Sequence, residues 1–507
     1  MSFVNEIVLP SLAPAAHRVT GSDDVAVALR PLAAGEAVEI EGVTVRLSQD
    51  VPWGHKFAMR GVAAGAPVRK YGWPIGAART PIAPGDWVHT HNLRTLLDGE
   101  EGYRWRDGAA AATGARADRP TFEGYLRADG RVGTRNEIWV LCTVGCVGRT
   151  ASRIAEQAHR QFAGRVDGVY AFPHPFGCSQ LGDDLDGTRR LLAALAAHPN
   201  AGGVLILGLG CENNQLDRLL AEAPGLDPAR VRAFSAQSVD NEEEAGLQAV
   251  REMVEIAERD RRTTRPLSDL VLGLKCGGSD GFSGLTADPL VGRMADALAQ
   301  AGGTPVLTEI PEIFGAERLL MNRAVDQAVF EDAAAVVNAF KRYFLDHGQP
   351  VYENPSPGNV AGGITTLEEK SLGAVQKAGS APLTQVLRYA ERVRRPGLAL
   401  LEAPGNDAVS STALTAAGAT VILFTTGRGT PMGFPAPTLK ISSNTALAER
   451  KPRWIDFDAG RLLGAEPADD VADDLLRLIL DTASGRPTRA EQNGEREIAV
   501  WKRGVTL

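Results

Sequence analysis

The sequence predicts an α/β protein in which a small N-terminal all-β module precedes a large C-terminal α/β body with a mainly parallel sheet. Two observations lead to this prediction. Short, partly alternating apolar segments separated by Gly and Pro turns occupy residues 1–95, a pattern typical of an all-β module. From residue 137 onward, apolar runs of strand length alternate with Ala- and Leu-rich stretches, which indicates a parallel sheet covered by helices.

Composition narrows the class of protein. The chain has 507 residues, with 54 Lys and Arg against 62 Asp and Glu, and a formal net charge of −8. This balance argues against nucleic acid or an anionic membrane as the main partner. Five cysteines are too few for a disulfide framework and favour a reducing, cytoplasmic setting. No apolar run approaches the ~20 residues that span a bilayer. A cytoplasmic enzyme is the leading class, and a multidomain binding protein is the alternative.

The chain divides into four expected segments. Residues 1–95 form the β module, and residues 96–120 lose periodicity and are rich in Ala, Gly, Asp and Arg, which predicts a linker. Residues 121–262 form a first α/β region, and residues 263–507 form the C-terminal α/β region. The α/β strands are expected at residues 138–142, 168–172, 203–207, 270–274, 305–308, 398–401 and 421–424.

Four cysteines follow four different expected strands. Because ligands bind beyond the carboxyl ends of strands in open parallel sheets, Cys146, Cys178, Cys211 and Cys276 are candidate metal ligands. Thiolates gathered there would suit iron, an iron–sulfur centre or zinc. A cysteine is also a common small core residue, and that interpretation is favoured for Cys142, which lies inside a strand.

Histidines form the next group of candidates. His174 lies between two prolines and could be a metal ligand, a general base or an ordinary loop residue. In the β module, His89 and His91 would face the same side of a strand, and His55 is a further candidate. Such histidines could share a metal or an anionic ligand, or they could lie on an exposed strand edge.

Charged and polar turns also follow strands in the C-terminal part. Lys275 ends a strand beside Cys276 and is a candidate cation. The turns that contain Asn406, Asp407 and Arg428 suit the binding of a carboxylate. We interpret Lys370 and Lys377 as solvated surface charges. Neither a complete dinucleotide fingerprint nor a phosphate-binding loop motif occurs, so nicotinamide and nucleoside triphosphates are disfavoured.

Motifs along nearly the whole chain resemble the altronate/galactarate (sugar-acid) dehydratase family. The matching stretches include residues 54–58, 70–72, 88–92, 129–133, 143–147, 177–184, 208–215, 276–281, 353–359, 403–407, 425–431, 454–458 and 504–507. The resemblance implies a β-clip, antifreeze-like module, a Rossmann-like body, a dimerising middle region and a homodimer. It implies a ferrous-iron-stimulated dehydration, with Mn²⁺ or another divalent metal as alternatives. D-Altronate is the first expected substrate, and galactarate or another aldarate or aldonate is the alternative.

Dehydration of a sugar acid needs a base for the proton next to the carboxylate and an acid for the departing hydroxyl. We assign His174 as the base and Lys275 as the reserve base or acid, with Arg428, Asn406 and Asp407 on the substrate. Iron is expected at the four strand-end cysteines, and His55, His89 and His91 are expected to face the site from the β module. The competing hypotheses are a non-catalytic sugar-acid binding protein and a zinc hydrolase that uses the cysteines and His174.

Overall fold

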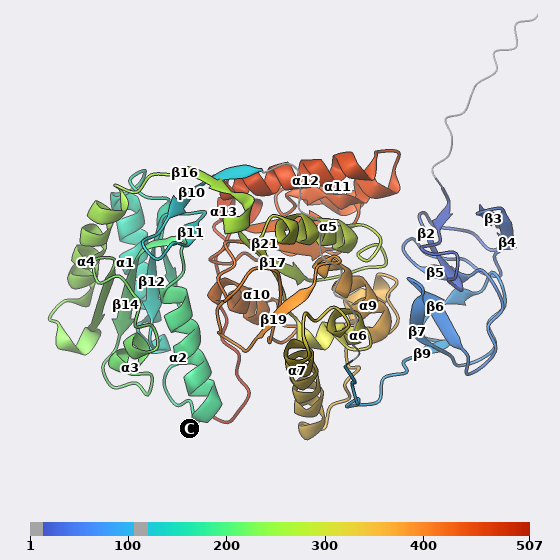
Figure 1. Ribbon diagram of the computed structural model, residues 1–507, viewed down its shortest axis with the longest axis horizontal. Helices are drawn as coiled ribbons and strands as arrows, with labels where there is room; N and C mark the ends of the chain where they lie inside the picture. Colours follow the sequence, from blue (N-terminus) through green and yellow to red (C-terminus); the bar gives the residue numbers. More distant parts are fainter. Residues whose placement is uncertain (1–13, 106–119, 507) are drawn as a thin grey trace, which may run out of the picture.

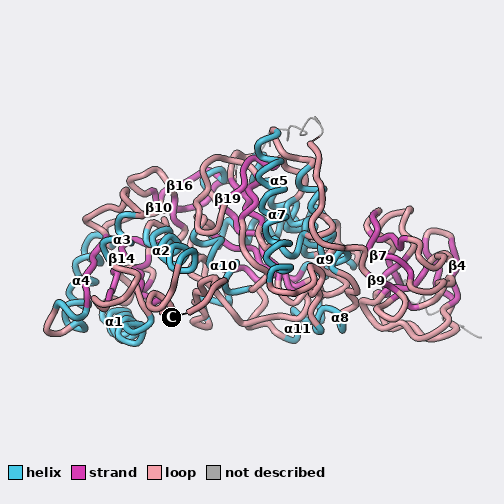
Figure 2. Tube along the Cα trace, turned by 90° about the horizontal axis from the view of Figure 1, so that it is seen from below, coloured by secondary structure: helices cyan, strands magenta, loops and turns pink. Residues whose placement is uncertain are grey.

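The protein consists of three parts arranged in a row. The computed structural model describes residues 14–105 and 120–506. An N-terminal all-β part lies at one end, a part with a seven-stranded parallel sheet lies in the middle, and a part with a four-stranded parallel sheet lies at the other end (Figure 1). Figure 2 shows the same order from a second direction. The predicted order of an all-β module before an α/β body with a large parallel sheet is confirmed. No helix in the described ranges is long and apolar enough to cross a membrane.

The β module is made of short antiparallel strands. They are β1 (Ala16–His17), β2 (Val25–Ala28), β3 (Ala37–Ile40), β4 (Val43–Arg46), β5 (Lys56–Ala58), β6 (Pro67–Lys70), β7 (Trp73–Ala78), β8 (Trp87–Val88) and β9 (Leu93–Arg94). They form sheets in the orders β1-β2-β5-β8, β3-β4 and β6-β7-β9. Turns with Gly in the left-handed region, such as Gly35 and Gly65, separate the strands and keep them short.

The second part is built on β12 (Glu137–Cys142), β13 (Gly168–Phe172), β14 (Ala201–Gly208) and β15 (Val231–Ser235), which are all parallel in the order β13-β12-β14-β15. Helices α1 (Gly148–Gln161) and α4 (Glu242–Ala257) pack on one face, and α2 (Gly182–Ala196) and α3 (Leu216–Ala221) cover the other. Every residue of β12 is buried, as expected for a strand covered on both faces. A small antiparallel sheet, β11-β10-β16, joins β10 (Thr121–Leu126), β11 (Val132–Gly133) and β16 (Thr263–Pro266).

The middle part holds the large parallel sheet. Its strands are β17 (Val271–Cys276), β18 (Thr304–Leu307), β19 (Leu383–Leu387), β20 (Leu398–Leu401), β21 (Val421–Thr426), β22 (Thr438–Ser442) and β23 (Phe457–Asp458), in the order β19-β20-β18-β17-β21-β22-β23. Its principal helices are α5 (Ala287–Gln300), α6 (Glu317–Met321), α7 (Gln327–Asp346), α8 (Pro357–Ala361), α9 (Leu367–Ala374), α10 (Asp407–Ala416), α11 (Thr445–Arg450), α12 (Ala468–Ala483) and α13 (Arg489–Gln492). Helices α5 and α12 pack over β21 on one face, whereas α10 packs on β17 from the other (Figure 1).

Each parallel sheet has one place where the strand order reverses. In the seven-stranded sheet, β17 leads to its neighbour β18 on one side, whereas β21 leads to β22 on the other. In the four-stranded sheet, β12 leads to β13 and β14 leads to β15 in the opposite direction. Ligands of open α/β sheets bind beyond the carboxyl ends of the strands at such a reversal. The topology therefore provides two candidate ligand crevices, one in each α/β part.

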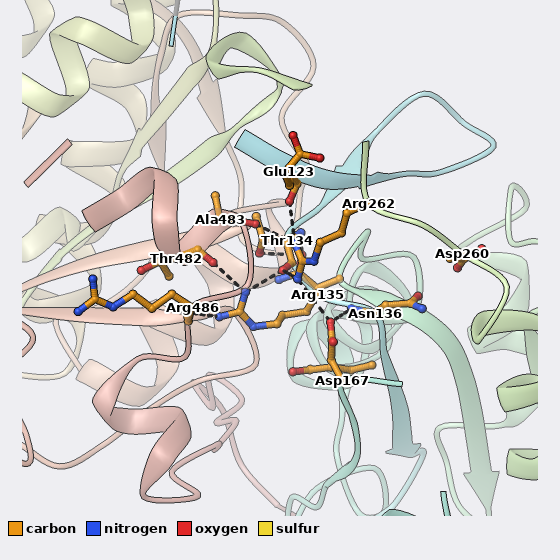
Figure 3. A network of polar contacts seen from close by, with 12 residues as sticks. Glu123, Thr134, Arg135, Asn136, Asp167, Asp260, Arg262, Thr482, Ala483 and Arg486 are labelled. Atoms are coloured by element: carbon orange, nitrogen blue, oxygen red, sulfur yellow. Dashed lines mark hydrogen bonds and ion pairs between the residues drawn. The ribbon is translucent and has the colours of Figure 1, made fainter. Parts of the chain in front are cut away.

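Two arginines, the buried Arg135 and the half-buried Arg262, join the α/β parts (Figure 3). Arg135, just before β12, donates to the carbonyl of Thr482 at 2.9 Å and to both carboxylate oxygens of Glu491 at 2.8 and 2.9 Å. Arg262 donates to the carbonyls of Glu123 at 2.7 Å and Ala483 at 3.1 Å, which lie in different parts of the chain. These contacts satisfy helix-end carbonyls of α12 and hold the two sheets together.

We expect Arg135→Ala to lower the free energy of unfolding by about 2 kcal/mol, because the buried carbonyls lose their donors and Glu491 loses one of the two ionic partners that the described residues give it. The measurement is chemical denaturation of the variant beside Arg477→Ala, whose side chain is 69% exposed. Equal stability of the two variants would show that Arg135 does not hold this interface.

The first half of the expected linker packs on the middle part. The Leu96 amide donates to Glu368 at 2.5 Å. Glu101 of this segment and Asn338 of α7 exchange two further hydrogen bonds. The ring of Trp105 packs against Phe330 with centroids 5.5 Å apart. Residues 96–105 are thus held against the body, and residues 106–119 of the expected linker lie outside the described ranges.

Candidate active site

A buried cluster of charged side chains lies at the reversal point of the seven-stranded sheet. Lys275 is fully buried near the end of β17. Its Nζ donates to Asp407 Oδ1 at 2.8 Å and also contacts Glu309. Burial disfavours the charged amine, but Glu309 and Asp407 raise the pKa of Lys275 above its ordinary value. Lys275 is therefore an ammonium group, held in place by two carboxylates.

Three potential ligand atoms converge beside Lys275. Cys276 Sγ and carboxylate oxygens of Glu309 and Glu312 all lie within 4.8 Å of one another, and all three residues are buried. Glu309 follows β18 in the left-handed region, with φ of 68°, a conformation that costs energy in a residue with a side chain and that is typical of functional sites. Burial raises the pKa of Glu309 to about 7. Burial also opposes ionisation of Glu312, but Lys370 and Lys275 lower its pKa to about 2.

Two further lysines complete this cluster. Lys370 Nζ donates to Glu312 Oε1 at 2.8 Å, and Lys377 Nζ donates to Cys276 Sγ at 2.9 Å. Both lysines are buried, so the expectation that they are solvated surface charges is wrong. Helix α9 and the turn after it carry them inward against the sheet edge. The positive charges of the three lysines offset the negative charges of the surrounding carboxylates. This balance allows so many ionisable groups to be buried together.

A cavity of about 1110 Å³ lies between the β module and this cluster. His55, Trp87 and His89 line it from the β module, and Asn354 and Gly405 line it from the body. Asn354 Nδ2 donates to Glu312 Oε1 at 3.3 Å, so the cavity wall touches the buried cluster. The cavity is large enough for a small-molecule ligand.

The two histidines of the β module that line the cavity lie side by side. The ring centroids of His55 and His89 are 5.1 Å apart. Their Nε2 atoms lie 3.4 and 3.2 Å from the carbonyl oxygens of Ala361 and Val360 in α8, so these nitrogens are the donors. Burial lowers the pKa of both rings, that of His89 to about 4, and keeps them neutral near pH 7. Among the described residues, the buried Nδ1 of His55 has no hydrogen-bond partner and can accept a proton or a hydrogen bond from a ligand.

An ion triad holds the β module against the body. Glu369 in α9 accepts from Lys56 Nζ at 2.8 Å and from Lys70 Nζ at 3.0 Å, and the three side chains are at most 2% exposed. Burial opposes ionisation of Glu369, but the two lysines lower its pKa well below the ordinary value. Trp53 of the module also packs on Phe282 of the body, with ring centroids 4.7 Å apart. These contacts position His55 and His89 over the cavity.

The structure places the candidate residues in three locations rather than one: the carboxyl edge of the seven-stranded sheet, the carboxyl edge of the four-stranded sheet, and the β module. At the carboxyl edge of the seven-stranded sheet lie Lys275 and Cys276 at the end of β17, Asn406 and Asp407 at the start of α10, and Arg428 in the loop after β21. Asn406 is exposed and its side chain accepts from Val409 N as the cap of α10, and Arg428 is exposed in the loop after β21. The candidates Cys146, Cys178, Cys211 and His174 instead follow strands of the four-stranded sheet. The four cysteines are therefore divided three to one between two sheets.

Two histidine candidates differ from their expected surroundings. His174 is buried, and both of its ring nitrogens have backbone partners: Nε2 lies 2.9 Å from the carbonyl oxygen of Cys142, and Nδ1 accepts from Phe176 N at 3.2 Å. The expectation that His89 and His91 share one face of a strand is wrong, because β8 ends at Val88 and a turn follows. In this turn His89 is buried and His91 is exposed.

Sequence reasoning missed Glu309, Glu312 and Glu369. Glu309 directly follows the expected strand 305–308, so the same rule that selected Lys275 could have selected it. The Glu369 triad joins residues 299 and 313 positions apart, and no local pattern in one sequence reveals such a pairing.

Each of the three parts of the fold matches a domain of a known protein family. Residues 15–96 match the altronate/galactarate dehydratase SAF domain, residues 124–258 match the D-galactarate dehydratase/altronate hydrolase second domain, and residues 267–506 match the C-terminal domain of D-galactarate/altronate dehydratase. Altronate dehydratase of Escherichia coli (strain K12) is 49% identical over 492 residues, which cover 97% of this chain and 99% of the relative.

Two further relatives extend the comparison. Altronate dehydratase of Bacillus subtilis (strain 168) is 46% identical over 97% of this chain and 99% of the relative. Galactarate dehydratase (L-threo-forming) of Escherichia coli (strain K12) is 34% identical over 90% of this chain and 91% of the relative. Similarity of this extent, through all three parts of the fold, shows that the chain belongs to the altronate/galactarate dehydratase family.

Proposed function

We propose that the chain is a hydro-lyase that converts D-altronate to 2-keto-3-deoxy-D-gluconate and water. The observation that carries the proposal is the near-full-length similarity to two altronate dehydratases, at 49% and 46% identity, against 34% for the galactarate enzyme. Galactarate is the alternative substrate.

The active site in this proposal is the cavity between the β module and the seven-stranded sheet. Removal of the proton next to a carboxylate adds negative charge to that carboxylate, and fixed cations stabilise this charge. Lys275 supplies such a cation, and Arg428 after β21 and Asp407 at the start of α10 would contact the substrate carboxylate and hydroxyls. His55 and His89 bind hydroxyl groups from the opposite wall.

We assign proton abstraction to Glu309. Burial raises the pKa of its carboxyl to about 7, and such a group can both accept and return a proton near neutral pH. His174 has no place in this step, because both of its ring nitrogens are engaged with backbone groups in the other α/β part. Its proposed role is instead to position the loops around it.

The residues at the site also fit a divalent metal. One thiol and two carboxylates converge, a donor set that suits Fe²⁺ and also Mn²⁺. Cys276 and Glu312 would hold the ion, Glu309 would stay free to act as the base, and Lys377 would donate a hydrogen bond to the Cys276 sulfur. Bound there, ferrous iron supplies a Lewis acid for the substrate oxygens.

We expect Cys276→Ser and Glu312→Gln each to weaken the binding of ferrous iron by about tenfold or more, because each removes one charged ligand. Equilibrium dialysis with Fe²⁺ under anaerobic conditions, without sulfide, measures this. Cys142→Ser is the matched control, since Cys142 is buried in the other sheet. Unchanged iron binding in both site variants would place the metal elsewhere.

The pH dependence of the rate tests the assignment of Glu309. A base must be ionised to act, so kcat/KM should rise as the pH increases through about 7. Glu309→Gln should remove this rise and lower kcat by about 10²-fold. The exposed residue Glu331 provides the control variant Glu331→Gln. A Glu309→Gln enzyme with the wild-type pH profile would exclude Glu309 as the base.

A panel of sugar acids tests the proposed activity. The protein, loaded with ferrous iron and thiol without oxygen, should release a 2-keto-3-deoxy acid from D-altronate faster than from any other acid. Turnover of galactarate alone would support the alternative substrate. Folded, iron-loaded protein that dehydrates no sugar acid would reject the proposal.

The proposal also covers the fold type of each part and the oligomeric state. The seven-stranded sheet with helices on both faces supports a Rossmann-like body, and the family resemblance supports a β-clip, antifreeze-like module. We also propose a homodimer, for which light scattering in solution is the test.

A further inference from the structure

We propose that Cys146, Cys178 and Cys211 form a three-thiolate site for an iron–sulfur cluster of the 4Fe–4S type. This site lies at the carboxyl edge of the four-stranded sheet, in the second α/β part. It is separate from the cluster around Lys275, and it does not depend on the function proposed above.

The three cysteines lie where the topology provides a ligand crevice. Cys146 follows β12 and Cys211 follows β14, the two adjacent strands between which the strand order reverses. Cys178 follows β13, the other neighbour of β12. Since the three strands are parallel and adjacent, their following loops share one edge of the sheet.

Hydrogen bonds tie the three loops to one another next to the cysteines. Gly145 N donates to the carbonyl of Phe176 at 2.9 Å, which joins the loops of Cys146 and Cys178. Asn214 N donates to Gly177 O at 2.9 Å, and Asn213 Oδ1 accepts from Ser179 N at 2.9 Å, which joins the loops of Cys178 and Cys211. The backbone on both sides of Cys178 is therefore held by the neighbouring loops.

The glycines that precede two of the cysteines permit this close approach. A Cβ at Gly145 would lie 2.9 Å from the carbonyl oxygen of His174, and a Cβ at Gly177 would lie 2.0 Å from that of Thr143. Ser179, directly after Cys178, adopts a left-handed conformation with φ of 59° although it has a side chain. Such a conformation persists only where the surroundings impose it, and it is characteristic of ligand sites.

The buried polar residues of this edge hold the loops from beneath. His174 uses both ring nitrogens to fix the turn that leads to Cys178. Glu212, next to Cys211, accepts from Leu209 N at 3.0 Å and Gly210 N at 2.6 Å and also contacts the Thr143 hydroxyl. The loops that carry the thiols are thus rigid, as ligand-bearing loops need to be.

The three thiols themselves are available to a ligand. All three are free and exposed, whereas Cys142 and Cys276 are buried. Their contacts are weak: Ser179 Oγ lies 3.9 Å from the sulfur of Cys178, and Gln237 Nε2 lies 3.7 Å from that of Cys211. Cysteines kept for packing would be buried, so exposure on three tied loops argues for a ligand.

The three sulfurs do not converge tightly enough to surround a single ion. One tetrahedral ion with metal–sulfur bonds of about 2.3 Å would bring its thiolates to about 3.8 Å of one another. The three sulfurs are not all within 4.8 Å of one another in the described part of the chain. An iron–sulfur cube separates its thiolates further, because each thiolate binds a different iron. Three thiolates would leave the fourth iron open to water or to an oxygen ligand.

Anaerobic reconstitution with ferrous iron, inorganic sulfide and thiol tests the proposal on the full chain. Wild-type protein should retain about four acid-labile sulfides per chain after desalting, with about four irons beyond the ion held at the Cys276 site and with the visible absorption of a cluster. Cys146→Ser, Cys178→Ser and Cys211→Ser should each lose most of the sulfide. Cys142→Ser and Cys276→Ser, at buried positions, should retain it.

A second measurement needs no variant and so does not depend on the folding of mutants. In the reconstituted wild-type protein, a maleimide should label Cys146, Cys178 and Cys211 far more slowly than in the apoprotein, as read by mass spectrometry of peptides. Absence of acid-labile sulfide from the reconstituted protein, or equal labelling with and without reconstitution, would overturn the cluster. Retention of wild-type sulfide in all three serine variants would also overturn it. Dehydratase activity is not the readout, so these outcomes are independent of the proposed reaction.

Discussion

Lys275→Met should lower kcat for D-altronate by about 10³-fold, because the ammonium group would no longer stabilise the charge that develops on the substrate carboxylate. Lys275 is fully buried and contacts both Glu309 and Asp407, so no neighbouring lysine can take its position without rearranging the cluster. Steady-state kinetics on iron-loaded protein measures the effect.

The control for this variant is Lys502→Met, which removes an exposed lysine outside the site. Circular dichroism should show that Lys275→Met remains folded, since Glu309 becomes neutral readily when its partner is lost. A Lys275→Met enzyme that keeps more than about a tenth of the wild-type kcat would show that this cation does not act on the substrate.

Glu369→Gln should destabilise the docked β module by about 3–5 kcal/mol, because Lys56 and Lys70 would remain buried without a counter-ion. The native pKa of Glu369 is lowered, so this contribution is present above its unfolded pKa of about 4.3 and is lost as the pH falls further. The readouts are the melting temperature and the rate of tryptic cleavage after Arg104, which lies in the segment packed on the body.

Glu39→Gln serves as the matched control, since Glu39 is an exposed glutamate of the same module. The destabilised variant should also lose affinity for substrate, because His55 and His89 line the cavity only while the module is docked. Equal melting temperatures and cleavage rates in the two variants would mean that the triad does not hold the module.

The sequence predicts the sheet arrangement better than it predicts the site. Fully apolar runs such as residues 421–424 identify strands covered on both faces, and Lys275 and Cys276 are found by their position after a strand. One sequence does not reveal that Cys276 belongs to a second sheet, so it cannot show that the four expected cysteine ligands are divided between two sheets.

Buried charges are the other feature that escaped the sequence. Lys370 and Lys377 look like surface lysines because each needs a distant partner, Glu312 or Cys276, to be buried. The histidines of the β module show a similar limit. His89 and His91 are two residues apart, but the end of β8 at Val88 turns only one of them inward.

The central claim is that the substrate binds at the reversal point of the seven-stranded sheet beneath the β module. Hydrogen–deuterium exchange with and without D-altronate, on the iron-loaded Glu309→Gln variant, tests it most directly. Binding should slow exchange in residues 276–283, 352–361 and 404–407 and in the turns around His55 and His89, which surround the cavity and the buried cluster. Protection confined to residues 143–147, 174–180 and 209–215 would place the substrate at the other sheet and would contradict this account.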